Sequence, residues 1–162
     1  PTMIRFGDHV LVLDADETSV ADAAQICNAL DPLLVADALW HASPADIAAL
    51  EQELAKMSRA AQEENGTEFI RANWRLHARI ATISPNAMLR SIYLGLLDLI
   101  ESHMISAQPV PGVALPRYLH KRYVLHRALV DAISARDRQA ALDLIAKHNT
   151  TSPPDLQTAS GA

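Results

Sequence analysis

Two histidines in the stretch from residue 122 to residue 148 each lie on an apolar helical face. Apolar residues follow His126 after three, four and seven positions, and apolar residues precede His148 at the same intervals. These intervals place side chains on one face of an α-helix. Asp137 is the midpoint between the two histidines and is a residue type that caps a new helix. We therefore expect a helical hairpin that brings His126 and His148 level with each other.

A second pair of polar residues, Asn73 and His77, is spaced by four positions within another apolar helical stripe. This spacing projects both side chains from one helical face, as paired ligands do in helical metal sites. A buried polar group without a partner costs about 1–3 kcal/mol, so three inward imidazoles and one amide need a shared partner. One divalent metal ion bound by Asn73, His77, His126 and His148 would supply it. Such donors suit zinc, which we favour, and also nickel, manganese or iron.

Each of these residues also has a simpler interpretation. A single buried histidine is more often a hydrogen-bonded core residue than a metal ligand, and Asn73 taken alone is more often a packing residue. If the three histidines only hydrogen-bond to one another, the chain is a helical structural module without a metal. The joint pattern of four inward polar residues favours the metal site.

The composition predicts one mostly helical domain. Of the 162 residues, 49% are hydrophobic, 4% are aromatic and only five are glycine. The formal net charge of −5 makes this surface a poor candidate for binding phosphate backbones. The single cysteine, Cys27, excludes an internal disulfide, and no apolar run approaches the roughly 20 residues of a membrane helix. We therefore expect a cytoplasmic protein that does not contact a membrane.

The apolar patterns and cap residues predict an all-α fold, an antiparallel bundle of about six helices over residues 18–149. The first helix should run from about residue 18 to residue 40, and Pro32 should kink or interrupt it. Further helices should begin at Ser43-Pro44, after Thr67 and at Ser84-Pro85, and residues 108–116 should form a loop. We predict that residues 1–17 are a linker or the remnant of an upstream segment, with a strand at residues 10–13 that lacks a partner in this chain. Residues 150–162 are predicted to be a disordered tail.

Four motifs occur in order along the chain: NWRLH at residues 73–77, SPNAML at 84–89, HRALVDAI at 126–133 and KH at 147–148. Together they resemble the FCD domain, the C-terminal effector-sensing and dimerisation domain of bacterial FadR-type GntR transcription regulators. The resemblance spans residues 19–149. It implies a helical homodimer that senses a small-molecule effector, such as an organic acid. It also implies that DNA is bound only by an N-terminal winged-helix domain, which is not in this chain.

In metal-binding members of this family, an aspartate and three histidines bind one divalent metal. The resemblance assigns these roles to Asn73, His77, His126 and His148. Asn73 replaces the family's aspartate, so metal binding should be weaker. The family's first helix also carries an Arg-x-x-Leu-Glu pattern whose arginine pairs with an acidic effector, whereas residues 28–31 here read NALD. This change removes a bidentate anchor for a carboxylate.

The candidate effector-binding residues are Asn28, Asn86, Arg122 and Tyr123. Arg122 is the best candidate partner for an anion, because it lies one helical turn before His126. We predict an effector-sensing and dimerisation domain rather than an enzyme.

The alternative is a metal-dependent hydrolytic or lyase-type enzyme, because a three-histidine metal with an open position can activate water. No acidic residue shares the predicted site faces to act as a general base, although Asp98 and Glu101 on the fourth helix keep this alternative open.

Overall fold

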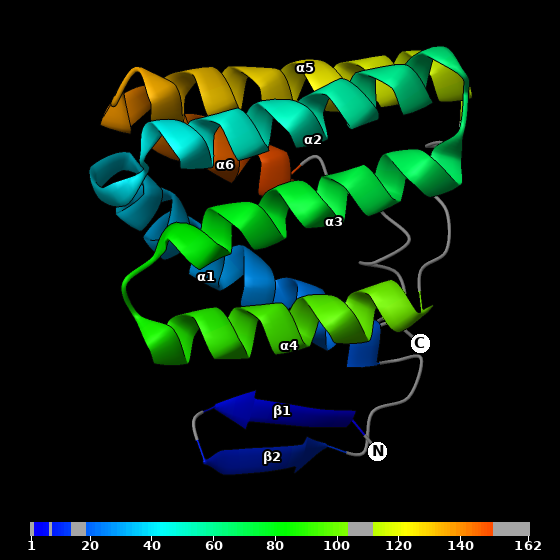
Figure 1. Cartoon of the computed structure of the whole chain (residues 1–162). Helices are drawn as coiled ribbons and strands as arrows, with labels where there is room; N and C mark the ends of the chain where they lie inside the picture. Colours follow the sequence, from blue (N-terminus) through cyan, green and yellow to red (C-terminus); the bar gives the residue numbers. More distant parts are fainter. Residues whose placement is uncertain (1, 7, 14–18, 104–111, 151–162) are drawn as a thin grey trace.

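A computed structural model describes residues 2–6, 8–13, 19–103 and 112–150 of the chain. Over these residues it contains six helices, which follow a β-hairpin (Figure 1). The helices are α1 (Ser19–His41), α2 (Pro44–Gln62), α3 (Gly66–Ile83), α4 (Ala87–His103), α5 (Leu115–Ser134) and α6 (Arg138–Thr150). The predicted all-α bundle of about six helices is therefore confirmed. The predicted tail after Thr150 lies outside the described residues.

The bundle is antiparallel from α2 onward, because each of these helices runs opposite to the one before it (Figure 1). Helix α3 packs against α2 and α4, α5 packs against α2 and α6, and α1 packs against α3, α4 and α6. Every described helix contributes buried apolar side chains to one core, among them Leu34, Leu50, Leu76, Leu129 and Ile145. The bundle surrounds α3, α5 and α6 with apolar neighbours, and these are the helices that carry the four predicted metal ligands.

Polar caps fix where several helices begin. At the start of α2, the backbone N–H of Asp46 donates to the Ser43 hydroxyl and the Ser43 N–H donates back to the Asp46 carboxylate. Asn65 caps α3 by accepting from Glu68, so this helix begins slightly before the predicted start. Asn86 caps α4 in the same way, since its Oδ1 accepts from the backbone of Leu89 at 3.0 Å.

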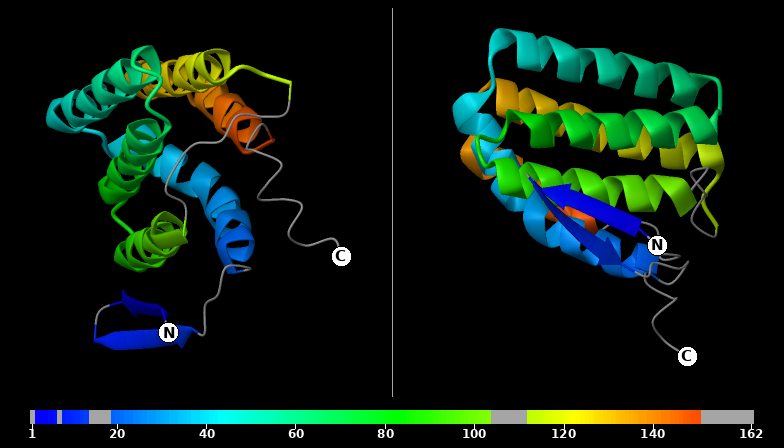
Figure 2. Two further views of the ribbon diagram at one scale, coloured as in Figure 1. Left: turned by 90° about the vertical axis from the view of Figure 1, so that its right-hand side faces the viewer. Right: turned by 60° about the horizontal axis from the view of Figure 1, so that its bottom comes forward.

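Helix α1 runs from Ser19 to His41 without a break, so of the kink or interruption predicted at Pro32 the interruption is not found. Figure 2 shows that the axis of α1 changes direction along its length. A proline has no backbone N–H, so the helical carbonyl four residues earlier, that of Asn28, loses its usual donor. That carbonyl instead accepts from the Asn149 side chain at 3.1 Å. A replacement donor from α6 therefore satisfies the acceptor that Pro32 leaves open.

The helical hairpin predicted around Asp137 is confirmed. Helix α5 ends at Ser134, α6 begins at Arg138, and the Asp137 carboxylate caps α6 by accepting from the backbone of Ala140. Between them Arg136 has a positive φ of 59°. Its guanidinium donates to the backbone carbonyls of residues 38, 39 and 42 at the end of α1. This contact fixes the hairpin against α1.

The prediction of a strand without a partner at residues 10–13 is wrong. Strand β2 (His9–Leu13) pairs antiparallel with β1 (Thr2–Phe6), with Thr2 opposite Leu13 and Phe6 opposite His9. Strand β1 also packs against α4. The signal in the sequence was Gly7-Asp8, a pair typical of two-residue hairpin turns. That residues 1–17 are a linker or remnant of another segment stays a prediction.

Candidate metal centre

Three histidine rings from three helices converge inside the bundle. His77 of α3, His126 of α5 and His148 of α6 point their Nε2 atoms at one another. The Nε2 of His77 lies 3.3 Å from that of His126 and 3.2 Å from that of His148, and the latter two lie 3.1 Å apart. The hairpin thus brings His126 and His148 face to face, and His77 completes the cluster. All three are buried, with exposed fractions of 6%, 0% and 7%.

The hydrogen-bond partners of the Nδ1 atoms determine which tautomers of His126 and His148 are present. His126 Nδ1 lies 2.6 Å from the backbone carbonyl of Arg122, and His148 Nδ1 lies 3.0 Å from the Asn149 side-chain oxygen. Both oxygens can only accept, so both Nδ1 atoms carry the proton and both Nε2 atoms present a lone pair to the cluster. His77 can donate one proton to one of these lone pairs. The Nε2 lone pairs of His126 and His148 still face each other at 3.1 Å with no proton between them.

Burial keeps all three rings neutral. Burial and, to a smaller extent, the nearby Arg122 guanidinium together lower the pKa of His77 to about 4. Burial, together with the repulsion that a second protonated ring or the Arg122 guanidinium would exert, also holds the pKa values of His126 and His148 well below their usual range. Neutral imidazole is the form that binds a metal ion.

The cluster fits a divalent metal. Two imidazole nitrogens that bind one ion at 2.0–2.1 Å lie about 3–3.4 Å apart for angles between octahedral and tetrahedral, which matches the observed spacing. Asn73 lies one turn before His77 on α3, and its Oδ1 is buried without a hydrogen-bond partner among the described residues. An unpartnered buried oxygen is costly. A cation between the three Nε2 atoms would satisfy the imidazole lone pairs together, and Asn73 Oδ1 is a further buried oxygen that needs a partner.

The predicted effector-binding residues lie in different environments. Asn28 contributes its backbone carbonyl to Asn149, and Asn86 is exposed and uses its side chain as the cap of α4. Tyr123 is half-buried against the core. Arg122 is buried and its guanidinium lies 3.4 Å from the backbone carbonyl of His148. Of the four, Arg122 is the one that contacts the histidine cluster through hydrogen bonds.

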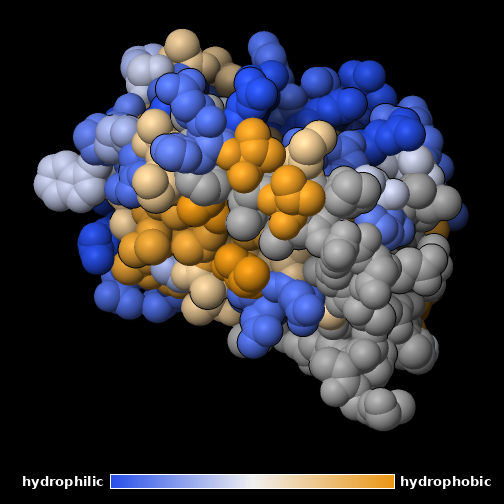
Figure 3. Space-filling model, turned by 90° about the horizontal axis from the view of Figure 1, so that it is seen from below, coloured by the Kyte–Doolittle hydropathy of each residue, from blue (hydrophilic) through white to orange (hydrophobic). Residues whose placement is uncertain are grey.

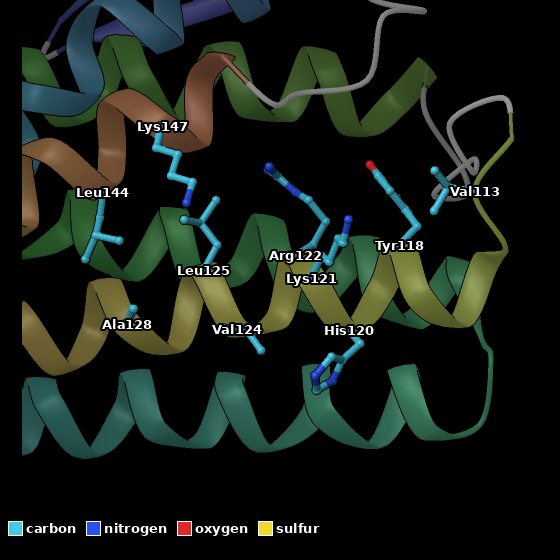
Figure 4. Close-up of a pocket in the computed structure, with 10 residues that line it drawn as sticks. All are labelled: Val113, Tyr118, His120, Lys121, Arg122, Val124, Leu125, Ala128, Leu144 and Lys147. Atoms are coloured by element: carbon cyan, nitrogen blue, oxygen red, sulfur yellow. The ribbon is translucent and has the colours of Figure 1, made fainter.

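A groove runs along the N-terminal half of α5 beside the end of α6, with a volume of about 830 Å³ (Figure 4). Its walls are mainly apolar, including Leu125 and Leu144. Lys121 and Arg122 line it from α5, and Lys147 extends toward Leu125 from α6. Lys121 and Lys147 were not among the predicted effector-binding residues, because residues 121 and 147 are brought together only by the turn between the two helices.

The acidic residues considered for the enzyme alternative do not join the cluster. Asp98 and Glu101 are exposed on α4. In the described ranges, the group of potential ligand side chains around the cluster consists of the three histidines and holds no carboxylate. No described helix is both long and apolar enough to cross a membrane.

Comparison with known proteins supports the fold and identifies the family. The chain superposes on E. coli McbR/YncC with a TM-score of 0.69 at 18% identity, over 97% of this chain and 77% of that one. It superposes on Streptococcus agalactiae GntR with a TM-score of 0.67 at 14% identity, over 93% of this chain and 73% of that one. At these identities the likeness shows a shared fold. A search of curated protein sequences finds no match.

A family model described as the FCD domain matches residues 22–151, which is most of the chain. FCD domains occur in GntR-family transcription regulators, which are generally dimeric and ligand-sensing and are generally not enzymes. The predicted resemblance is therefore confirmed, and this chain belongs to the FCD domain family.

Proposed function

We propose that this chain is the effector-sensing and dimerisation domain of a GntR-type transcription regulator, and that it binds a divalent metal at the histidine cluster. The observation that carries the proposal is the convergence of three neutral imidazoles, with Nε2 atoms 3.1–3.3 Å apart. His77, His126 and His148 would hold the ion, and Asn73 would supply a weaker fourth donor through its unpartnered Oδ1. Zinc suits this donor set best, and nickel or manganese is compatible with it.

The effector in this proposal is a small organic anion with an apolar body. Three cationic side chains, Lys121, Arg122 and Lys147, line a mainly apolar groove. Arg122 links this groove to the cluster in two ways. Its guanidinium approaches the carbonyl of His148, and its own carbonyl accepts from His126. An anion that binds Arg122 would therefore change the surroundings of both metal ligands.

Regulation would follow from differential affinity. An effector that binds one arrangement of the dimer more tightly than another shifts the population toward it by that difference in free energy. DNA would be contacted by an N-terminal winged-helix domain outside this chain. The residues here would supply the sensing and the dimer contact.

Metal analysis tests the proposal directly. Protein purified without a chelator or a histidine tag should contain about one equivalent of divalent metal per chain, because three imidazole nitrogens converge on one position. Short-chain carboxylates and sugar acids should raise its melting temperature without being consumed. Absence of metal after reconstitution with zinc, nickel or manganese would refute the site. Turnover of an ester or phosphate panel that is lost in His77→Ala would instead favour the enzyme alternative.

An exposed apolar stripe on α1 supports dimerisation with a second copy of the chain. Ile26, Leu33 and Trp40 are spaced by seven residues along one helical face and are 46%, 56% and 79% exposed. Figure 3 shows that apolar surface also gathers on the lower side of the molecule, where the β-hairpin of β1 and β2 lies. Contiguous exposed apolar surface typically marks a protein interface, and two-fold dimers pair the same patch on both subunits.

Introducing a charge into this stripe should weaken the dimer. Leu33→Glu places a carboxylate in the proposed interface, so light scattering after gel filtration should detect monomers at a concentration where the wild type is dimeric. Helical content by circular dichroism should not change, because Leu33 is outside the core. Val124→Glu, at a 48% exposed position on α5, serves as the matched control and should remain dimeric. A wild-type protein that is monomeric at tens of micromolar would contradict the proposal.

A further inference from the structure

Asn149, the residue after His148, ties the histidine cluster to α1. Its side-chain Oδ1 accepts from His148 Nδ1 at 3.0 Å, and its Nδ2 donates to the backbone carbonyl of Asn28 at 3.1 Å. The Asn149 amide therefore accepts a hydrogen bond from His148 on one side and donates one to the Asn28 carbonyl on the other. No motif in the sequence points to this residue.

Pro32 determines which way this amide faces. The carbonyl of Asn28 lacks a helical donor because position 32 has no N–H, and a carbonyl can only accept. The Asn149 Nδ2 must therefore face Asn28, which leaves Oδ1 facing His148. An oxygen at that place holds the proton of His148 on Nδ1 and directs the Nε2 lone pair into the cluster. A proline in one helix thus sets the tautomer of a histidine in another.

A buried carboxylate adds a second anchor for the same amide. Asp31 of α1 is 5% exposed, accepts a hydrogen bond from the Tyr93 hydroxyl of α4 at 2.6 Å, and also bonds to the Asn149 side chain. The amide is therefore held by two groups of α1, one of which is fixed in turn by α4. This network lies outside the donor set and has no part in the function proposed above.

We infer that Asn149 is a positioning residue for the metal centre, and that Pro32, Asp31 and Tyr93 hold it in place. This inference rests on the proposed metal site. A hydrogen-bond acceptor behind a ligating imidazole fixes the ring and raises its basicity, and loss of such a partner typically lowers metal affinity by about 10–100-fold. The network also makes the affinity depend on α1 and α4, neither of which touches the ion.

The test compares zinc affinities by chelator competition, with the visible absorption of the cobalt form as a second readout. Asn149→Leu removes the hydrogen bonds to His148, Asn28 and Asp31 and should weaken zinc binding about 10–100-fold. The cobalt spectrum should also change, because His148 is no longer held in one tautomer. Gln139→Leu removes an exposed amide of the same helix, which bonds Asp143, and should bind zinc as the wild type does.

Two further variants separate positioning from folding. Pro32→Ala restores an N–H that can reclaim the Asn28 carbonyl, so it should leave the metal-free fold at least as stable and yet weaken zinc binding. The double variant Asn149→Asp with Asp31→Asn leaves the Asn28 carbonyl without its donor but keeps an acceptor on His148, held by an amide at position 31, and should recover part of the affinity lost in Asn149→Leu.

Wild-type zinc affinity in both Asn149→Leu and Pro32→Ala would overturn the inference while leaving the metal site intact. Failure of the wild-type protein to bind zinc would instead refute the proposed function on which the inference rests. Weaker binding in Asn149→Leu together with recovery in the double variant would support the inference.

Discussion

Replacing His126 by alanine should lower the affinity for zinc by about two to three orders of magnitude. Zinc sites with four protein ligands bind with roughly 10–16 kcal/mol, so one ligand is worth about 2.5–4 kcal/mol. His126 is fully buried, and its outer nitrogen is held by the carbonyl of Arg122 at 2.6 Å. No other described histidine is placed to replace it at the cluster. Chelator competition measures the affinity.

The same variant should lose stability mainly in the presence of metal. A ligand that binds only the folded state stabilises it in proportion to the logarithm of its concentration over its dissociation constant. Added zinc should therefore raise the melting temperature of the wild type far more than that of His126→Ala. His41→Ala changes an exposed histidine at the end of α1 and serves as the control. Equal zinc-induced shifts in wild type and His126→Ala would contradict the proposed ligand.

The stability of the metal-free protein should depend on the protonation of Asp31. Burial raises the pKa of this carboxyl from 3.8 to about 7, although hydrogen bonds from Tyr93 and Asn149 act to lower it. The folded state therefore holds the proton more tightly than the unfolded state. The corresponding stability is fully present below about pH 4 and is lost as the pH rises to about 7. A shift of this size corresponds to about 4 kcal/mol.

Asp31→Asn removes this dependence. The stability of the variant relative to wild type should rise by about 4 kcal/mol between pH 4 and pH 8. Urea unfolding in a chelator at several pH values measures the difference. The buried histidines act in the opposite direction, because their lowered pKa values make the metal-free fold less stable as the pH falls below about 6.5. That effect is common to both proteins and cancels in the difference.

Asp22→Asn provides a matched control, since Asp22 is an exposed acid in the first turn of the same helix. A difference between Asp31→Asn and wild type that stays constant from pH 4 to pH 8 would show that Asp31 is ionised in the folded protein throughout this range.

Helical periodicity carried most of the candidate site. Four-residue spacing placed Asn73 and His77 on one face, and the cap at Asp137 placed His126 opposite His148. These are local properties, which a single sequence displays directly. That His77 meets the other two rings was a hypothesis in the sequence, because it depends on how α3 packs against the hairpin. The resemblance to the FCD family pointed to the same residues.

The parts that escaped prediction depend on contacts between distant segments. A kink or an interruption at Pro32 was predicted, but not that Asn149 replaces the lost donor from more than a hundred residues away. The partner of β2 was missed because the strand at residues 2–6 was not recognised. Asn86 could have been identified as a cap, since it directly precedes a helix and belongs to a residue type that favours that position. The sequence motif that contains it suggested a ligand contact instead.

The donor set has a consequence for charge balance. Three neutral imidazoles and an amide carry no formal charge, so a bound divalent ion would keep its full double positive charge inside the bundle. The Arg122 guanidinium adds another positive charge beside His148. Uncompensated charge is costly in a protein interior, so an anion that binds near the ion would relieve this cost. The bound metal would then raise the affinity of the domain for the anion, and the anion would raise its affinity for the metal by the same factor. The domain would respond most strongly when both are present.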